Sequence, residues 1–238
     1  MALVPVSERG YAHPELIAET DWLAQNLSSP TLRIIDARPP QQYEAGHIPG
    51  AVNLSGFGGI PRAENGDMAD PAQFAEVAGK LGVGDDTAVV VYDAPSQMMG
   101  MVAWSFLYYG HGDTRLLDGG IAKWLAEGRP VSTEISAYPP AVFHAHPVAE
   151  LYCSLDSAKT SHGRAGAIFW DTRSLAEYEG TAAAAWDPLP RPGRIPGAVH
   201  LEWTELFDST TKTFKPAGEL RELLKAHGIT PESEVNSY

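Results

Sequence analysis

Cysteine is almost absent from this chain of 238 residues, which contains it only as Cys153. A single cysteine excludes an intrachain disulfide framework and a zinc site built from several cysteine ligands. Such scarcity is typical of proteins in a reducing compartment, so we expect a cytoplasmic location. We expect neither a metal nor an organic cofactor.

Basic residues and long apolar runs are scarce as well. The chain has 17 lysines and arginines against 30 acidic residues, and its formal net charge is −13. Without a basic cluster, it lacks the surface that a nucleic-acid partner requires. No apolar run approaches the ~20 residues of a membrane span, and the start MALVPVSERG has no secretory pattern. We therefore expect neither nucleic acid nor membrane as a partner, and an anionic substrate would need a local positive site.

What the sequence does contain is a long internal repeat. The first copy reads IIDARPPQQYEAGHIPGAVNL over residues 34–54, and the second begins IFWDTRSLAEYEG at residue 168 and finishes GRIPGAVHL at residue 201. The recurring positions include Asp36, Arg38, Tyr43, Gly82 and Tyr92, matched in order by Asp171, Arg173, Tyr178, Gly228 and Tyr238. Residues 181–192, TAAAAWDPLPRP, are an insertion that only the second copy carries.

Each copy has the same order of patterns. An apolar run (32–35 or 167–170) leads into the Asp-x-Arg, and an Ile-Pro-Gly turn and a helical stretch (71–81 or 217–227) follow. Short apolar runs that alternate with helical patterns predict an α/β fold with parallel sheets flanked by helices. We expect a first domain over 1–130, a proline-rich linker over 131–147 and a second domain over 148–238.

Functional residues are expected at the carboxyl ends of the strands, where loops enter helices. In the first copy this position is Asp93, which follows Tyr92, and in the second it is the residue after Tyr238. The first copy continues from Tyr92 to about residue 130, whereas the second stops at Tyr238. We therefore expect the second domain to be incomplete and loosely folded, and its site loop to be missing.

These motifs together resemble those of the two-domain rhodanese family of sulfurtransferases. The resemblance rests on the Asp-x-Arg strand end, the passage YEAGHIPGAVN, the segment LLDGG with Trp124 after it, and the duplication itself. It covers the chain from about Glu15 to Tyr238. It implies tandem rhodanese-like domains and transfer of a sulfane sulfur from thiosulfate to cyanide or another thiophilic acceptor through a cysteine persulfide. The expected partners are therefore a small anionic sulfur donor and that acceptor.

By the same resemblance, the first domain is catalytically silent, with Asp93 at the position of the nucleophile. The nucleophilic cysteine of the second domain is expected just after Tyr238, so the chain as written is predicted to be inactive. Relatives that use 3-mercaptopyruvate tend to carry an arginine near the position of Glu177. Glu177 therefore favours thiosulfate as donor, with 3-mercaptopyruvate as the alternative.

Three residues are candidates for the rim of this site: Asp171, Arg173 and Arg194. Asp171 and Arg173 lie two apart on an extended segment and so share a face. They either brace the loops at the strand end or shape the rim directly. Arg194, which stands where the first copy has His47, either supplies positive charge to an anionic donor or is a solvated turn residue.

Other chemistry-bearing residues have plainer interpretations. Cys153 lies far from the expected loop, so we interpret it as a small packing residue rather than a nucleophile. His144 and His146 lack a third ligand for a metal. Trp104, Tyr108 and Tyr109 follow helical spacing and are expected in the core or at a domain interface.

Two other functions remain open at this stage. If both copies are silent, the tandem is a non-catalytic binding or regulatory module. A phosphatase, to which single rhodanese domains are similar, would also need a cysteine in a slightly longer loop, and nothing in the sequence favours it.

Overall fold

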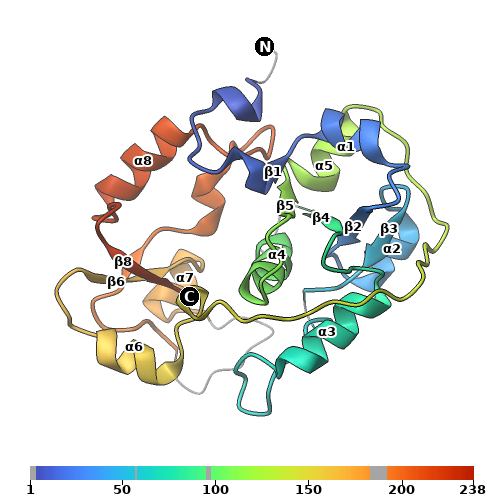
Figure 1. Cartoon of the computed structure of the whole chain (residues 1–238). Helices are drawn as coiled ribbons and strands as arrows, with labels where there is room; N and C mark the ends of the chain where they lie inside the picture. Colours follow the sequence, from blue (N-terminus) through green and yellow to red (C-terminus); the bar gives the residue numbers. More distant parts are fainter. Residues whose placement is uncertain (1–3, 57, 95–97, 183–191) are drawn as a thin grey trace. The chain divides into compact units, whose positions relative to one another are not determined.

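A computed structural model of the chain describes residues 4–56, 58–94, 98–182 and 192–238 (Figure 1). Most of the insertion in the second copy, residues 183–191, lies outside the described residues. The chain divides into two compact units. The first unit comprises Met1–Tyr152 with Ser209–Thr213, and the second comprises Cys153–Asp208 with Phe214–Tyr238.

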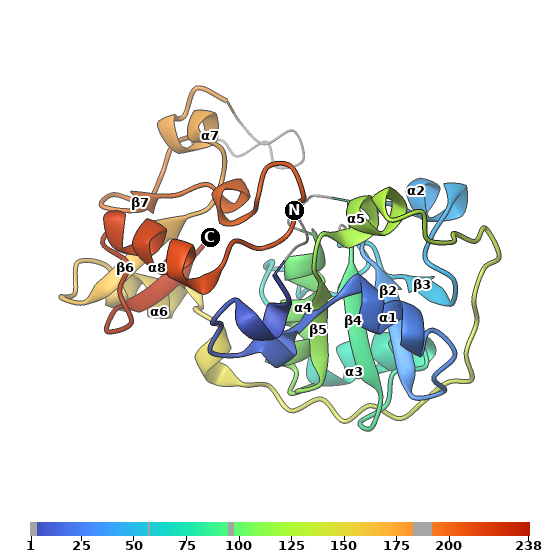
Figure 2. The same cartoon turned by 90° about the horizontal axis from the view of Figure 1, so that it is seen from above.

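The first unit is a five-stranded parallel sheet in the order β1-β5-β4-β2-β3, flanked by helices (Figure 2). Its strands are β1 (Ile17–Ala18), β2 (Leu32–Asp36), β3 (Ala51–Asn53), β4 (Ala88–Tyr92) and β5 (Thr114–Leu117). Its helices are α1 (Thr20–Asn26), α2 (Pro40–Ala45), α3 (Pro71–Lys80), α4 (Met98–Tyr108) and α5 (Gly120–Ala126). Short 3₁₀ helices are η1 (Val6–Glu8), η2 (Pro14–Leu16) and η3 (Ala149–Leu151).

The middle strands of this sheet form its core. Val89, Val90, Val91 and Tyr92 of β4 are all fully buried, as expected for a strand covered on both faces. Local signals set the ends of the helices around it. The Asp70 carboxylate accepts a hydrogen bond of 2.8 Å from the backbone N–H of Ala72 at the start of α3, where a proline occupies the first turn.

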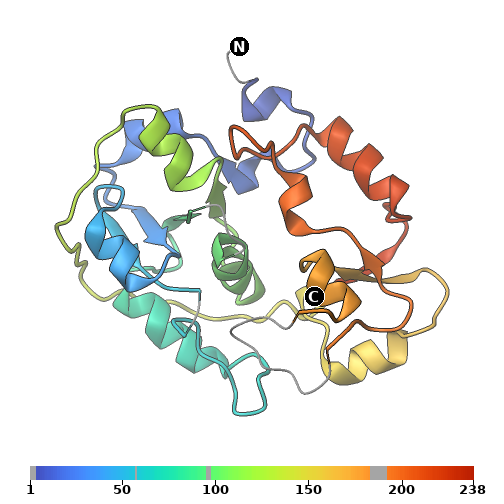
Figure 3. The same ribbon diagram turned by 180° about the vertical axis from the view of Figure 1, so that it is seen from behind.

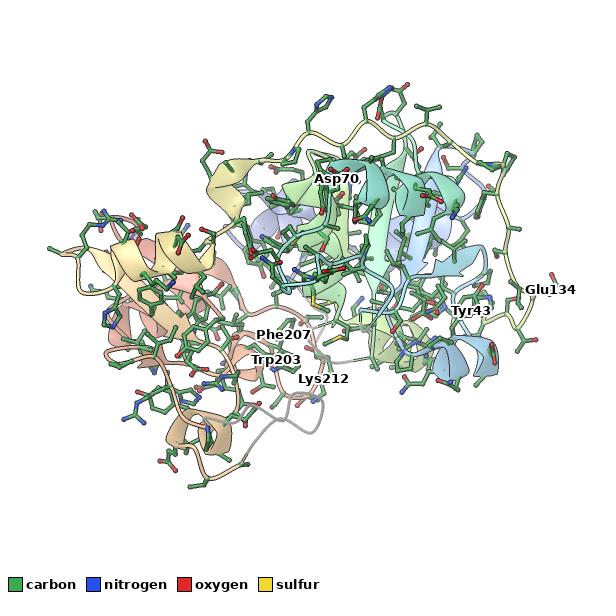
Figure 4. The ribbon with its side chains drawn as sticks, turned by 90° about the horizontal axis from the view of Figure 1, so that it is seen from below. Tyr43, Asp70, Glu134, Trp203, Phe207 and Lys212 are labelled. Carbon is green, nitrogen blue, oxygen red and sulfur yellow. The ribbon has the colours of Figure 1, made fainter. Side chains whose placement is uncertain are left out.

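The second unit is a smaller parallel sheet in the order β7-β6-β8. Its strands are β6 (Ala167–Asp171), β7 (Val199–His200) and β8 (Glu234–Ser237), and its helices are α6 (Leu155–Ser161), α7 (Leu175–Glu179), α8 (Ala217–Ala226) and the 3₁₀ helix η4 (Trp203–Leu206). Trp203 and Phe207 pack edge to face in this unit, with ring centroids 5.9 Å apart (Figure 4). Trp170 pairs with Ser237, just as Ile35 pairs with Val91, so β6 and β8 have the register of β2 and β4.

Residues 131–148, called the strap below, are held along the first unit. The strap includes the segment expected as a linker and runs past α3, as Figure 3 shows from behind. Ser132 pairs with His47 through two backbone hydrogen bonds of 2.8 and 2.9 Å. Glu134 of the strap and Tyr43 of α2 lie at the same end of the first unit (Figure 4). Further along, the N–H of Ala141 donates to Gly79 in α3.

Side chains of the strap complete the packing of the first unit. The phenol of Tyr138 donates to the Gly50 carbonyl at 2.8 Å, and the Arg33 guanidinium lies 3.7 Å from the centre of its ring. Phe143 is buried against Phe74 and Phe106, with centroid distances of 5.8 and 6.2 Å. The strap is therefore part of the fold of the first unit, which extends to Tyr152.

In the described part of the chain, no helix is long and apolar enough to cross a membrane.

We predict that Gly79→Ala destabilises the first unit by about 1–3 kcal/mol, because the structure cannot accept the added methyl without a shift. A Cβ at this position would lie 2.5 Å from the carbonyl oxygen of Ala141 in the strap. Gly100→Ala in α4 is the control, since its Cβ would meet no described atom within 4 Å, and it should be neutral or stabilising. Thermal unfolding measures both, and a Gly79→Ala protein as stable as the parent would contradict the close approach of the strap.

We predict faster amide hydrogen exchange in β8 than in β4. Among the described residues, no strand pairs with the outer edge of β8, and Val235 is 39% exposed, whereas its counterpart Val89 is fully buried between two neighbouring strands. Alternate N–H groups of an unpaired edge face water and exchange readily. Equal protection of Val235 and Val89 would show that the edge of β8 is covered.

Candidate active site

The ends of β6 and β8 bring together the segment Asp171, Thr172, Arg173 and the side chain of Tyr238. Asp171 is the last residue of β6 and is fully buried. Tyr238 follows β8, which lies beside β6 in the sheet. Two of the predicted rim residues, Asp171 and Arg173, thus stand at the strand end where the sequence placed them.

Arg173 is bound to Asp171 through two of its nitrogens. Its Nε donates to Oδ1 at 2.9 Å and its Nη2 donates to Oδ2 at 2.5 Å, while its backbone N–H donates to Oδ1 at 3.1 Å. Nη2 also donates to the carbonyl of Gly193 at 2.8 Å, which ties the pair to the turn before Ile195. A buried carboxylate requires such donors, because an unpaired charge is costly to bury.

Tyr238 connects this pair to the Ile-Pro-Gly turn. Its phenol oxygen accepts a hydrogen bond of 3.0 Å from the backbone N–H of Ile195, and the phenol is also hydrogen-bonded to Asp171. The Arg173 guanidinium carbon lies 5.3 Å from the centre of its ring. One phenol group therefore fixes β8, the ion pair and the turn with respect to each other.

The first unit contains the same network. The Tyr92 phenol donates to Oδ2 of Asp36 at 2.7 Å and accepts from the N–H of Ile48 at 3.1 Å. Arg38 donates from Nε to Oδ1 of Asp36 at 2.9 Å, and from Nη2 to the Gly46 carbonyl at 2.7 Å. The network is therefore a property of both units and does not by itself distinguish a working site from a silent one.

The electrostatics follow from burial and pairing. Burial by itself would raise the pKa of Asp171, but the hydrogen bonds from Arg173 and Tyr238 overcome this effect and lower it. Burial, together with the neighbouring Asp171 carboxylate, raises the pKa of Tyr238. The carboxylate is thus held ionised and the phenol protonated at neutral pH.

Asp93 occupies the corresponding strand end in the first unit. Its side chain is buried, and its Oδ2 accepts a hydrogen bond of 3.0 Å from the N–H of Met99 at the start of α4. Its carbonyl accepts from Ile121 at 2.9 Å, and a Cβ on Gly120 would lie only 2.4 Å from that oxygen. An anionic side chain stands here at a helix N-terminus, which favours negative charge. Residues 95–97 of this loop lie outside the described residues.

Arg194, the third candidate for the rim, covers a tyrosine. Its guanidinium carbon lies 4.3 Å from the centre of the Tyr178 ring, and Nη1 is 3.3 Å from the Tyr178 carbonyl. In the first unit His47 stacks on Tyr43 in the same way, with a centroid distance of 3.9 Å. Arg194 itself is exposed to solvent.

The structure corrects the interpretation of Cys153 as a small packing residue, because this cysteine is exposed. Partial burial of the sulfur raises the pKa of the thiol, and the negative charge of Glu234 raises it further. A raised pKa lowers the fraction of thiolate, the nucleophilic form.

Of the aromatic residues interpreted as core, Tyr109 is fully buried, and its ring stacks on Phe74 with a centroid distance of 4.1 Å.

Histidines of the strap have ordinary partners. His144 Nδ1 lies 2.6 Å from the Asp85 carboxylate, and the backbone N–H of His146 donates to the Tyr109 carbonyl. No group of three or more candidate metal ligands occurs among the described residues.

Two features of the site were not recognised in the sequence. Glu177 and Ser174 form a capping box at the start of α7, with the serine N–H and hydroxyl donating to Oε2 at 3.1 and 2.6 Å. The spacing Ser-x-x-Glu could have predicted it. Thr172 and His200 also belong to the network, since Thr172 Oγ1 donates to the backbone oxygen of Tyr238 at 2.9 Å and His200 Nε2 lies 2.8 Å from the Arg173 carbonyl.

Comparison with known proteins decides the family. The sequence profile of the rhodanese-like domain matches residues 19–127. The sulfur carrier protein TtuD of Thermus thermophilus is 33% identical to the chain, over 96% of this chain and 84% of that protein. The chain belongs to the rhodanese family. The resemblance inferred from the repeated motifs is therefore confirmed, and so is the α/β fold with its parallel sheet flanked by helices.

Other relatives of this rhodanese are sulfurtransferases by name. A putative thiosulfate sulfurtransferase SseA from Mycobacterium tuberculosis is 33% identical over 96% of this chain and 78% of that protein. Among solved structures, SseA from Escherichia coli, described as a 3-mercaptopyruvate sulfotransferase, superposes with a TM-score of 0.80 at 26% identity, over 93% of this chain and 87% of that one.

We predict that Asp171→Asn destabilises the second unit at neutral pH by about 1–3 kcal/mol, because hydrogen bonds from charged donors lose their acceptor charge. The pKa of Asp171 lies below its ordinary value of 3.8 in the folded state. Its contribution is therefore present above that value and lost as the pH falls through the folded pKa, and Asp171→Asn should remove this part of the acid sensitivity.

Urea unfolding followed by tryptophan fluorescence from pH 7 to pH 3 measures both effects. The control is Asp156→Asn, whose carboxylate is paired with Lys159 but whose side chain is 93% exposed, so that its loss should have little effect. Equal stability of the parent and Asp171→Asn at pH 7 would contradict the role of the pair.

Proposed function

We propose that this rhodanese is a sulfurtransferase that moves a sulfane sulfur from thiosulfate to a thiophilic acceptor such as cyanide, with the second unit as its working site. In this proposal the nucleophile is a cysteine at the position after Tyr238. The observation that carries it is the common register of β2 with β4 and of β6 with β8, which aligns Tyr238 with Tyr92. The position after Tyr238 thereby corresponds to Asp93.

The reaction proceeds in two displacements. The cysteine thiolate attacks the outer sulfur of thiosulfate, the bond between the two sulfur atoms of the donor breaks, and sulfite leaves with the electron pair. The enzyme then carries a persulfide. Cyanide attacks the terminal sulfur of that persulfide, so that thiocyanate departs and the thiolate is regenerated. A strand end followed by a helix N-terminus suits this chemistry, because free N–H groups there stabilise a thiolate.

In this mechanism Arg173 supports the site rather than binds the donor. Its Nε and Nη2 are already engaged by the Asp171 carboxylate and the Gly193 carbonyl. The Asp171 carboxylate offsets much of the attraction that the guanidinium would exert on a substrate anion. Backbone N–H groups after Tyr238 are therefore assigned to the anionic donor.

The first unit is assigned a silent role. Asp93 occupies the corresponding position, and a carboxyl group neither accepts a sulfane sulfur nor attracts an anionic donor. Its hydrogen bond with the Met99 N–H already occupies the start of α4. The alternative donor, 3-mercaptopyruvate, is named for the E. coli relative. Glu177, whose carboxylate is engaged in the capping box of α7, stands near the position where relatives that use 3-mercaptopyruvate tend to carry an arginine, so it favours thiosulfate over this alternative.

We predict that a protein of these 238 residues forms no thiocyanate above the blank from thiosulfate and cyanide. Cys153→Ser should leave that result unchanged, because the thiol lies on an exposed segment and its pKa is raised. Adding the residues that the coding sequence specifies after Tyr238 should bring activity, which replacement of the first added cysteine by serine abolishes.

Two outcomes would contradict the assignment. Turnover by the 238 residues that survives Cys153→Ser would place the nucleophile elsewhere. An extended protein without a cysteine after Tyr238 would favour the other function, a non-catalytic tandem whose activity lies in binding.

A further inference from the structure

His47 of the first unit places both of its ring nitrogens against backbone carbonyl oxygens. Nδ1 lies 2.8 Å from the carbonyl oxygen of Tyr43 in α2, and Nε2 lies 3.0 Å from that of Glu134 in the strap. The ring is fully buried and stacks on the Tyr43 ring, with a centroid distance of 3.9 Å and an angle of 12° between the two planes. The imidazole therefore bridges α2 and the strap.

These two contacts distinguish between the protonation states of the ring. A carbonyl oxygen only accepts hydrogen bonds, whereas a neutral imidazole has one N–H donor and one nitrogen lone pair. Either neutral tautomer of His47 therefore turns a lone pair toward one of the two oxygens. Since the ring is fully buried, bulk water cannot supply the missing donor. Only the imidazolium donates to both oxygens at once.

The second unit has a permanent cation at the same position of the repeat. The guanidinium carbon of Arg194 lies 4.3 Å from the centre of the Tyr178 ring, and Nη1 lies 3.3 Å from the Tyr178 carbonyl. His47 has the same two contacts with Tyr43. Arginine is charged at every physiological pH and is attracted to the face of an aromatic ring. Histidine can fill the same role only while its ring is protonated.

The charged and titratable groups around this ring come from several elements. The Arg38 guanidinium after β2 is bound to the Asp36 carboxylate at 2.9 and 2.6 Å, so that these two charges offset each other. Burial raises the pKa values of Tyr43 in α2 and of Tyr92 in β4, so both phenols stay protonated. Glu134 contributes an exposed side chain from the strap. The two carbonyl oxygens are therefore the groups that most directly favour a protonated ring.

We propose that His47 is a pH-dependent latch, which holds the N-terminal half of the strap, residues 131–138, when its ring is protonated. Protonation gives the ring a second donor, so the latch tightens as the pH falls and loosens as it rises. By linkage, a ring that binds its proton better with the strap docked stabilises docking below the usual range of histidine titration and loses this effect above it. The inference concerns the fold of the first unit and does not depend on the proposed function.

The C-terminal half of the strap provides an internal comparison. Phe143 stacks on the ring of His111 with a centroid distance of 5.7 Å, and burial lowers the pKa of His111, so acid does not favour this packing. His144 lies 2.6 Å from the Asp85 carboxylate, but both side chains are exposed and such a pair contributes little. Acid should therefore tighten the strap only in residues 131–138.

The test follows the protein of 238 residues by NMR between about pH 5 and about pH 8, where histidine titrates. Long-range proton–nitrogen spectra report the protons on both ring nitrogens of His47. Hydrogen exchange, corrected for the intrinsic rate at each pH, gives the protection of the Ser132 amide, which donates to the His47 carbonyl. We expect this protection to be about tenfold greater at the acid end, with the same midpoint as the ring. Protection of the Ala141 amide, which donates to Gly79, should not rise.

His47→Gln separates the ring from the rest of the fold. The glutamine amide can donate a hydrogen bond but does not titrate, so protection of Ser132 should become independent of pH. His227→Gln is the matched control, because its Nδ1 also lies 2.9 Å from the carbonyl four residues earlier, that of Leu223, at the end of α8 in the second unit. This variant should keep the tenfold rise of the parent. The measurements on the parent stand by themselves if His47→Gln does not fold.

Three results would overturn the latch. The first is a His47 ring that keeps a single proton over the whole range while the Ser132 amide stays protected. The second is a rise in protection that His47→Gln retains. The third is an equal rise at Ala141, because acid would then stabilise the first unit as a whole rather than through this ring.

Discussion

The buried carboxylate at the end of the first strand of each motif is the constraint on which the rest of this structure depends. Asp36 and Asp171 are both fully buried, and each must find enough donors to remain ionised. The arginine two residues later supplies them, and the phenol at the end of the neighbouring strand supplies another. Satisfying one charge thus draws a strand, a turn and a second strand to the same point.

This constraint explains why two units with different strand-end residues share one framework. The donors around the carboxylate come from groups that both units possess. What differs is the residue at two positions: Asp93 caps α4 in the first unit, and in the second unit Thr172, which stands where the first has Ala37, adds a hydroxyl that donates to the backbone oxygen of Tyr238.

Much of this arrangement could be predicted from the sequence, because it is periodic or repeated. The apolar runs identified β2, β4 and β6, and the match of Tyr92 with Tyr238 anticipated the common register of the strands. Partners far apart in the sequence could not be predicted. A pattern does not reveal that Arg173 is bound to the Gly193 carbonyl, or that the guanidinium of Arg194 lies over Tyr178.

Two interpretations made from the sequence differ from the structure, each for a specific physical reason. Cys153 was interpreted as packed because small sulfur residues are commonly buried, but it lies just before α6 and is exposed there. Residues 131–147 were interpreted as a linker between the two domains because prolines disfavour helices and strands. Extended backbone can nevertheless be ordered by isolated contacts, and Tyr138 and Phe143 supply them here.

The strap also sets an order of events during synthesis. Its contacts span long stretches of chain, since the residues that it joins are 87 positions apart at His47 and Glu134 and 88 apart at Gly50 and Tyr138. Chains emerge from the ribosome from the N-terminus, so all strands of the first unit emerge before the strap does. Until Phe143 has emerged, the rings of Phe74 and Phe106 lack a neighbour that buries them in the finished fold. The nascent first domain thus passes through an interval in which an aromatic surface is open to chaperones or to other nascent chains, and arrival of the strap ends that interval.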